Sequence, residues 1–168
     1  LVDLGHDIAD HGDLRRTHPD ISTNPSSWRL PDERKADVLD LAARTSDAGL
    51  GILANGHFPL FLGGDHSIAM GSLSAVARHN APKGRPVHVL WVDAHADYNT
   101  PDTSPSGNLH GMPLALLCGE PEFDDSFRGP WLGHIEPRNV TIFGARSIDR
   151  EERRLLHARG VEVIDMRK

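Results

Sequence analysis

Residues 87–99 read VHVLWVDAHADYN, an apolar run that passes directly into a polar segment. The run Val87–Val92 is apolar along nearly its whole length, a pattern typical of strands in a parallel sheet that helices cover on both faces. In open sheets of this kind, ligands bind beyond the carboxyl ends of the strands. The polar residues that begin at Asp93 are therefore the first candidates for a functional site.

The same alternation extends along the chain in both directions. We expect a helix that begins at Pro31 and is stopped by Gly56, helices at 67–79, 110–118 and 150–159, and strands at 59–62, 87–92, 140–143 and 161–164. Residues 6–31, rich in Pro, Asn and Ser, are expected to form a surface loop, and Leu1–Gly5 resembles the end of a buried strand. This order predicts an α/β fold with three α/β/α layers around a mostly parallel central sheet.

Length and composition limit the remaining possibilities. The 168 residues suit one domain spanning 1–168, and the net charge of -6 provides no basic surface for nucleic acid or an anionic membrane. The single cysteine, Cys118, excludes an internal disulfide and a thiolate-rich zinc site. A reducing compartment, with the cytoplasm as the default, fits this composition, and no apolar run approaches the roughly 18 residues of a membrane span.

Asp93, His95 and Asp97 occupy alternate positions directly after the apolar run. In extended geometry their side chains would point to one side and could together bind a metal ion. This combination of oxygen and nitrogen ligands suits Mn, Fe, Co or Zn, and its two carboxylates favour Mn. His66, at the end of another expected strand, could complete the ligand set. Burying such a group is costly unless a cation compensates it.

A second polar segment runs from Asn99 to Gly111. Asn99, Ser106 and Asn108 provide hydrogen-bonding groups that could receive a carboxylate or an amine. Taken alone, such clusters of Ser, Asn, Gly and Pro are mostly ordinary turns.

Three motifs together resemble the signatures of the ureohydrolases, and specifically of the arginase family. They are GGDHS at 63–67, WVDAHADYNTP at 91–101 and SGNLHGMP at 106–113. Agmatinases share the first two motifs, whereas the Asn-Thr-Pro and Ser-Gly-Asn segments are similar to the loop with which arginases recognise an amino acid. The resemblance implies an arginase-like fold, hydrolysis of L-arginine to L-ornithine and urea by a hydroxide activated by two manganese ions, and a homo-oligomer, a trimer or hexamer, in the intact protein.

The resemblance also implies a role for individual residues. His66, Asp93, His95 and Asp97 correspond to manganese ligands, with Asp93 bridging the two ions and Asp97 also orienting the hydroxide, and His110 corresponds to the histidine that protonates the leaving amine. The implied substrate-binding set is His95, Asn99, Ser106, Gly107, Asn108, Asp149 and Glu152, the last two near the α-ammonium group. An acidic first turn favoured by the helix dipole is the structural alternative for Asp149 and Glu152. Tyr98 occupies a position where an aliphatic residue is more usual in such motifs.

One part of the family pattern has no counterpart in these residues. The family has two further metal-binding aspartates in an Asp-x-Asp motif, but Asp165 is followed two positions later by Arg167. We therefore expect a fragment that lacks the C-terminal part and the true N-terminus. We expect this chain alone to be nearly inactive and the full-length protein to be active. The missing strands would also leave an open sheet edge.

Other functions remain open at this level. A related amidinohydrolase would act on agmatine, a guanidino acid or formimidoylglutamate. A catalytically inactive metal-binding or ligand-binding module would keep the strand-end acids without the reaction. A dinucleotide-binding domain is disfavoured because no G-x-G-x-x-G turn follows a strand.

Overall fold

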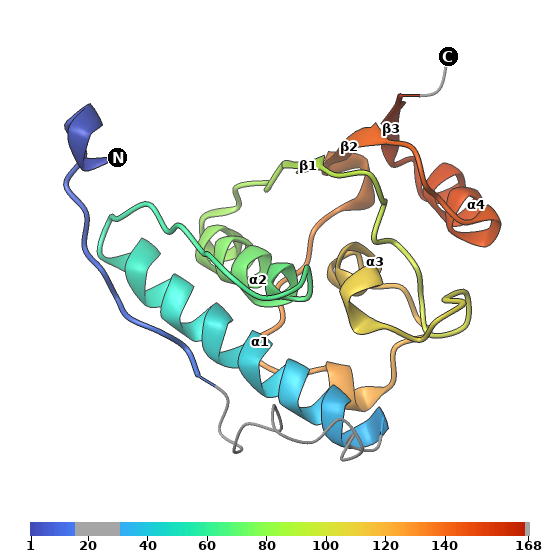
Figure 1. The fold of residues 1–168 in the computed structure, drawn as a ribbon, viewed down its shortest axis with the longest axis horizontal. Coiled ribbons are helices and arrows are strands. Elements are labelled where there is room, and N and C mark those ends of the chain that lie inside the picture. The colour runs from blue at the N-terminus through green and yellow to red at the C-terminus, as the bar shows by residue number, and fades with distance from the viewer. Residues whose placement is uncertain (16–30, 167–168) are drawn as a thin grey trace.

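The computed structural model describes residues 1–15 and 31–166 of the chain and contains a parallel sheet of three strands. The strands β1 (Val89–Val92), β2 (Val140–Ala145) and β3 (Glu162–Asp165) lie side by side in that order. Val89 pairs with Val140, and Ile142 pairs with Val163. Because all three strands are parallel, their carboxyl ends and the loops that follow them meet at one edge of the sheet (Figure 1).

The helices are α1 (Pro31–Ala54), α2 (Ile68–Asn80), α3 (Pro113–Leu117) and α4 (Arg150–Arg159). Short 3-10 turns lie at Val2–Leu4, Ala81–Lys83, Leu109–Gly111, Asp125–Phe127 and Pro137–Asn139. α4 ends where Gly160 adopts a left-handed conformation, φ 71°, which turns the chain into β3. None of the helices in the described ranges combines the length and apolar character that a membrane crossing requires.

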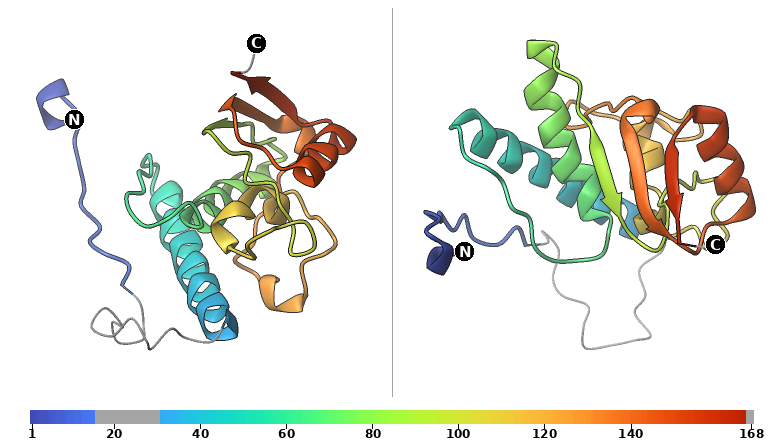
Figure 2. Two further views of the ribbon diagram at one scale, coloured as in Figure 1. Left: turned by 45° about the vertical axis from the view of Figure 1, so that its right-hand side comes forward. Right: turned by 90° about the horizontal axis from the view of Figure 1, so that it is seen from above.

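The described helices pack against one face of the sheet. Val89, Trp91, Val140 and Ile142 from that face join one buried cluster with side chains of all four helices, among them Leu39, Met70, Leu114 and Leu156. The alternate strand residues Leu90, Val92, Phe143 and Ile164 are 67%, 68%, 44% and 43% exposed, and Figure 2 shows this face of the sheet in front, with the helices behind it. The parallel α/β arrangement expected from the sequence is confirmed. The second helical layer is not formed by residues 1–15 and 31–166.

The boundaries of most expected elements agree with the structure. The helices expected at 67–79 and 150–159, and the helix between Pro31 and Gly56, correspond to α2, α4 and α1. Of the segment 110–118, only Pro113–Leu117 forms an α-helix, since a 3-10 turn at Leu109–Gly111 precedes it. The strand expected at 87–92 begins only at Val89. Part of the expected loop at 6–31 lies outside the described residues.

Two strand predictions were wrong. Residues 59–62 are not part of the sheet; Leu62 is 83% exposed, and Phe58, just before the segment, is 90% exposed. Leu1–Gly5 contains a 3-10 turn, and Leu1, Val2 and Leu4 are exposed rather than buried. An apolar run becomes a strand only where its backbone N–H and C=O groups pair with a neighbour, and the order β1-β2-β3 pairs neither segment.

The pair α1 and α2 packs closely because small residues lie between the two helices. At Gly71 of α2, an added Cβ would lie 2.4 Å from the carbonyl oxygen of Ala42 and 2.6 Å from Cβ of Thr45, both on α1. This contact positions the start of α2, and therefore His66 just before it.

Replacement of Gly71 by alanine should lower the free energy of unfolding by about 1–3 kcal/mol, because the α1 backbone must move to admit the methyl group. Gly51→Ala on α1 is the matched control, since nothing lies within 4 Å of its added Cβ. The control should be neutral or stabilising by up to about 1 kcal/mol through helix propensity. Guanidinium denaturation followed by circular dichroism measures both changes, and an equal effect in the two variants would contradict the close contact.

Candidate active site

Backbone hydrogen bonds join the segment that follows β1 to the loop that follows β2. The backbone N–H of Asp93 donates to the carbonyl of Phe143 at 3.1 Å, extending the ladder by one residue. The Ala94 carbonyl then accepts from the N–H groups of Arg146 and Ser147 at 2.9 and 3.0 Å. These bonds hold the first residues after the strand in a bend rather than in a further extension of it.

Asp97 is held in an unusual backbone conformation. Its φ of 48° is the only positive φ among the described non-glycine residues, and its carbonyl accepts from the N–H of Leu114 at 3.0 Å. We expected strand alternation to aim Asp93, His95 and Asp97 to one side. That explanation is wrong, because the chain does not continue as a strand beyond Val92. The bend at 93–95 and the left-handed turn at Asp97 produce the convergence instead.

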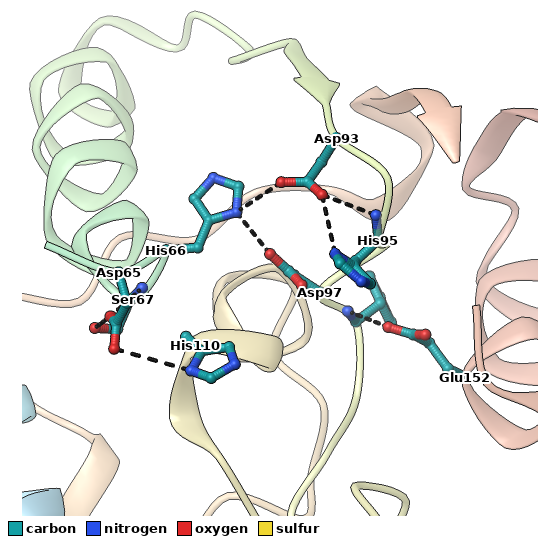
Figure 3. A network of polar contacts seen from close by, with 9 residues as sticks. Asp65, His66, Ser67, Asp93, His95, Asp97, His110 and Glu152 are labelled. Carbon is teal, nitrogen blue, oxygen red and sulfur yellow. Dashed lines mark hydrogen bonds and ion pairs between the residues drawn. The ribbon is translucent and has the colours of Figure 1, made fainter. Parts of the chain in front are cut away.

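The imidazole of His66 contacts both carboxylates (Figure 3). Its Nδ1 lies 3.2 Å from Oδ2 of Asp93 and 2.7 Å from Oδ2 of Asp97. One ligand atom from each of these three residues lies within 4.8 Å of the others, a spacing that could hold a metal ion. Two carboxylates and one imidazole are the donor types that suit Mn, Fe, Co or Zn.

Two contacts orient the His66 ring, one with an indole and one with a carboxylate, and the second also affects its pKa. The ring stacks on the indole of Trp91, with centroids 4.1 Å apart and planes inclined by 23°. The hydrogen bond to Asp97 is the main influence that raises the pKa of His66 above its usual 6.5, against the opposing effect of burial. The imidazole thus contacts both acids through the same nitrogen, Nδ1.

His95 lies next to this cluster rather than within it. Its backbone N–H donates to Oδ1 of Asp93 at 2.8 Å, its Nδ1 is 3.3 Å from the same oxygen, and its side chain is 62% exposed. Asp93 therefore presents Oδ2 to His66 and Oδ1 to His95.

The cluster opens into a cavity of about 290 Å³. Its lining includes every site residue expected from the sequence except Gly107, namely His66, Asp93, His95, Asp97, Asn99, Ser106, Asn108, His110, Asp149 and Glu152. Ser104, Pro105, Gly111 and Ser147 also line it, although the sequence analysis gave them no role. The position of Ser147 directly after a strand was the signal that could have indicated it.

His110 lies in the 3-10 turn that precedes α3. Its side chain is 49% exposed, and its Nδ1 is 3.8 Å from Oδ2 of Asp65, the residue before His66. The imidazole therefore lines the same cavity as the carboxylate cluster without belonging to it.

Asn99 and Asp149 both line the cavity and are hydrogen-bonded to each other. The Asn99 amide donates to Oδ2 of Asp149 at 3.1 Å, while its Oδ1 accepts from the Thr103 hydroxyl at 2.9 Å. In the loop beyond, the Ser106 hydroxyl accepts from the Asn108 N–H at 3.2 Å. Amide and hydroxyl groups of this loop thus face a carboxylate that begins α4.

Glu152 is buried, with 3% of the residue exposed. Its Oε1 accepts from the N–H of Tyr98 at 2.8 Å and its Oε2 from the N–H of Asp149 at 3.2 Å, the latter as part of a capping box at the start of α4. Burial raises the pKa of Glu152, and these two hydrogen bonds oppose the shift.

Solved structures place this fold in a known class. An arginase from Bacillus subtilis superposes with a TM-score of 0.81 at 35% identity, covering 98% of this chain and 53% of that chain. The arginase from Bacillus caldovelox gives a TM-score of 0.80 at 35% identity, again over 98% of this chain and 53% of that chain. The arginase-like α/β fold is thus confirmed.

Sequence comparison identifies the family. The model of the Arginase family matches residues 2–168, and the chain belongs to that family. Among curated relatives, the arginase of Agrobacterium fabrum is 39% identical over 168 residues, which is 99% of this chain and 50% of that protein. The chain thus spans about half the length of the curated relatives it matches.

In the metal-free protein, the pKa of His66 should lie above 6.5 and should fall toward that value when Asp97 is replaced by asparagine, because the neutral amide no longer favours the imidazolium. The raised pKa stabilises the folded chain below about pH 6.5, and this stabilisation is lost as the pH rises through the folded-state pKa. NMR titration of the His66 ring proton, assigned with a His66→Gln variant, measures the shift. An unchanged pKa in Asp97→Asn would contradict the hydrogen bond as its main cause.

Proposed function

We propose that this chain is part of an arginase, which hydrolyses L-arginine to L-ornithine and urea with two manganese ions as cofactors. One observation carries the proposal. The His66–Asp93–Asp97 cluster and the Asn99–Asn108 loop line the same cavity, so a metal-binding group and groups suited to an amino acid lie together. The names of the matched relatives support the same reaction.

His66, Asp93, His95 and Asp97 would hold the metal ions. The two oxygens of Asp93 face different histidines, at 3.2 Å from His66 and 3.3 Å from His95, which suits a carboxylate shared between two cations. Divalent cations bound there would lower the pKa of water and so supply a nucleophile near neutral pH. The role of Asp97 in this proposal is to orient that nucleophile through its carboxylate.

His110 is the proposed general acid. Its half-exposed imidazole lines the cavity opposite the carboxylate cluster, and a histidine can gain and lose a proton near neutral pH. As the C–N bond of the guanidinium group breaks, the imidazole would give its proton to the departing amine of ornithine.

The far end of the cavity would bind the amino-acid part of the substrate. Asn99, Ser106 and Asn108 would receive the α-carboxylate, and the exposed Asp149 would attract the α-ammonium group. Glu152 lies near the same position, but both of its oxygens accept backbone N–H groups. We therefore assign the direct contact to Asp149.

The proposal concerns the full-length protein, since the chain spans about half the length of its relatives. Two further aspartates of the family pattern would complete the metal site. We also propose that the 168 residues belong to a single domain, and that the full-length protein is a cytoplasmic homo-oligomer, a trimer or hexamer.

The full-length protein, loaded with manganese, should release urea from L-arginine, whereas the 168-residue chain should release at most traces. Asp93→Asn in the full-length protein should lower kcat/KM by at least about a hundredfold, because loss of an interaction with the charged metal site removes several kcal/mol of transition-state stabilisation. Colorimetric urea detection measures all three proteins. Bound manganese without urea release would contradict the arginine assignment, and no bound manganese in the wild type would contradict the metal site itself.

Asn108→Ala should discriminate between substrates with and without an α-carboxylate. Loss of a hydrogen bond to a charged group should lower kcat/KM for L-arginine by about 10–100-fold, while agmatine, which lacks that carboxylate, should be hydrolysed as by the wild type. Steady-state kinetics with both substrates measure the ratio. A wild-type preference for agmatine would instead favour a related amidinohydrolase.

A further inference from the structure

Tyr98 is the residue between Asp97 and Asn99, and it is completely buried. Its phenol hydroxyl donates to Oε1 of Glu120 at 3.1 Å. A buried phenol beside a cluster of metal-binding residues therefore has a defined polar partner.

Glu120 is fixed in turn by an arginine. Only 4% of Glu120 is exposed, and its two oxygens accept from Nε and Nη2 of Arg159, each at 2.8 Å. This two-point pairing leaves the carboxylate little freedom to rotate. Tyr98, Glu120 and Arg159 form a chain of charge-assisted hydrogen bonds, which we call the Tyr98 network.

The Tyr98 network reaches the C-terminal end of α4, because Arg159 is the last residue of that helix. At the N-terminal end of the same helix, Glu152 accepts the backbone N–H of Tyr98 at 2.8 Å. The residue next to Asp97 is thus attached to both ends of α4, through its backbone at one end and its side chain at the other.

These attachments lie where the backbone most needs support. Asp97 has a φ of 48°, which residues other than glycine rarely adopt, although aspartate does so more often than most, and which neighbouring contacts can hold in place. The contacts on either side of Asp97 are the N–H of Leu114, which holds its carbonyl, and the two attachments of Tyr98. Its carboxylate reaches Nδ1 of His66 at 2.7 Å from this conformation.

We propose that Tyr98, held by Glu120 and Arg159, is a positioning residue that keeps the Asp97 carboxylate directed at His66, and that the hydrogen bond from the Tyr98 N–H to Glu152 serves the same role. The metal-binding consequence rests on the proposed function. The backbone consequence does not, because the contacts that define it lie within this chain.

The test uses Tyr98→Phe in the full-length protein. This change removes one hydroxyl and leaves the aromatic ring and the Glu120–Arg159 pair in place. Ser46→Ala is the control, since Ser46 is also fully buried and its hydroxyl donates to the carbonyl of Trp131 at 2.7 Å and accepts from Nη1 of Arg78 at 2.8 Å, on the α1 side of the core. Arg159→Lys, which loses the two-point pairing but keeps the charge, is a second variant with a partly exposed side chain.

Two readouts separate positioning from stability. Free Mn²⁺ measured by electron paramagnetic resonance should give a Kd raised about tenfold in Tyr98→Phe, as is typical when a residue behind a metal ligand is altered, and a smaller rise in Arg159→Lys. Hydrogen exchange of the peptide 93–99 should become faster in both variants. Ser46→Ala should lower the melting temperature by a similar amount and change neither readout.

Each outcome decides one question. Wild-type exchange at 93–99 together with wild-type Mn²⁺ affinity in Tyr98→Phe would overturn the positioning role, and so would an equal loss of affinity in Ser46→Ala. A wild-type protein that binds no Mn²⁺ would contradict the proposed function, and exchange at 93–99 would then decide the positioning role alone.

Discussion

The carboxylates of Asp93 and Asp97 approach the same nitrogen of His66, at 3.2 and 2.7 Å. Two acids that are one-quarter exposed and one-tenth exposed repel each other unless positive charge lies between them. In this chain the imidazole of His66 lies between them, its pKa raised mainly by the hydrogen bond to Asp97, and a metal ion would supply positive charge at the same position. The surrounding structure depends on this constraint, since the backbone must be held firmly enough to keep two like charges together.

The parallel sheet provides the first part of that support. Because β1 and β2 run in the same direction, the segments that follow them leave the sheet at the same edge, where Ala94 accepts two N–H groups from 146–147. The same arrangement carries Asp149, four residues beyond β2, to the amide of Asn99. A polar contact between residues 50 positions apart is therefore a direct result of strand order.

Local sequence patterns predicted the features that depend on residues close together in the chain. The limits of α4 follow from its acidic first turn and from Gly160, and the polar residues after β1 and β2 were correctly placed around one cavity. Residues 59–62 were wrongly predicted as a strand, because an apolar run does not reveal whether a strand partner lies beside it. The positive φ of Asp97 could not be predicted from the sequence, because aspartate tolerates this conformation better than most residues but adopts it only rarely. The Tyr98 network joins positions 98, 120 and 159, a separation that no motif spacing could indicate.

The two acids at the start of α4 illustrate how one sequence pattern can contain two functions. Asp149 and Glu152 are both acidic residues of a first turn, and their spacing alone makes them equivalent candidates for an ammonium group. Both carboxylates accept hydrogen bonds, and the structure separates them by exposure, because Asp149 is exposed at the cavity whereas only 3% of Glu152 is exposed. A buried carboxylate that already accepts two hydrogen bonds gains little from a third partner and loses much if it moves. Its contribution is therefore made through Tyr98, one residue away from the acid that contacts His66.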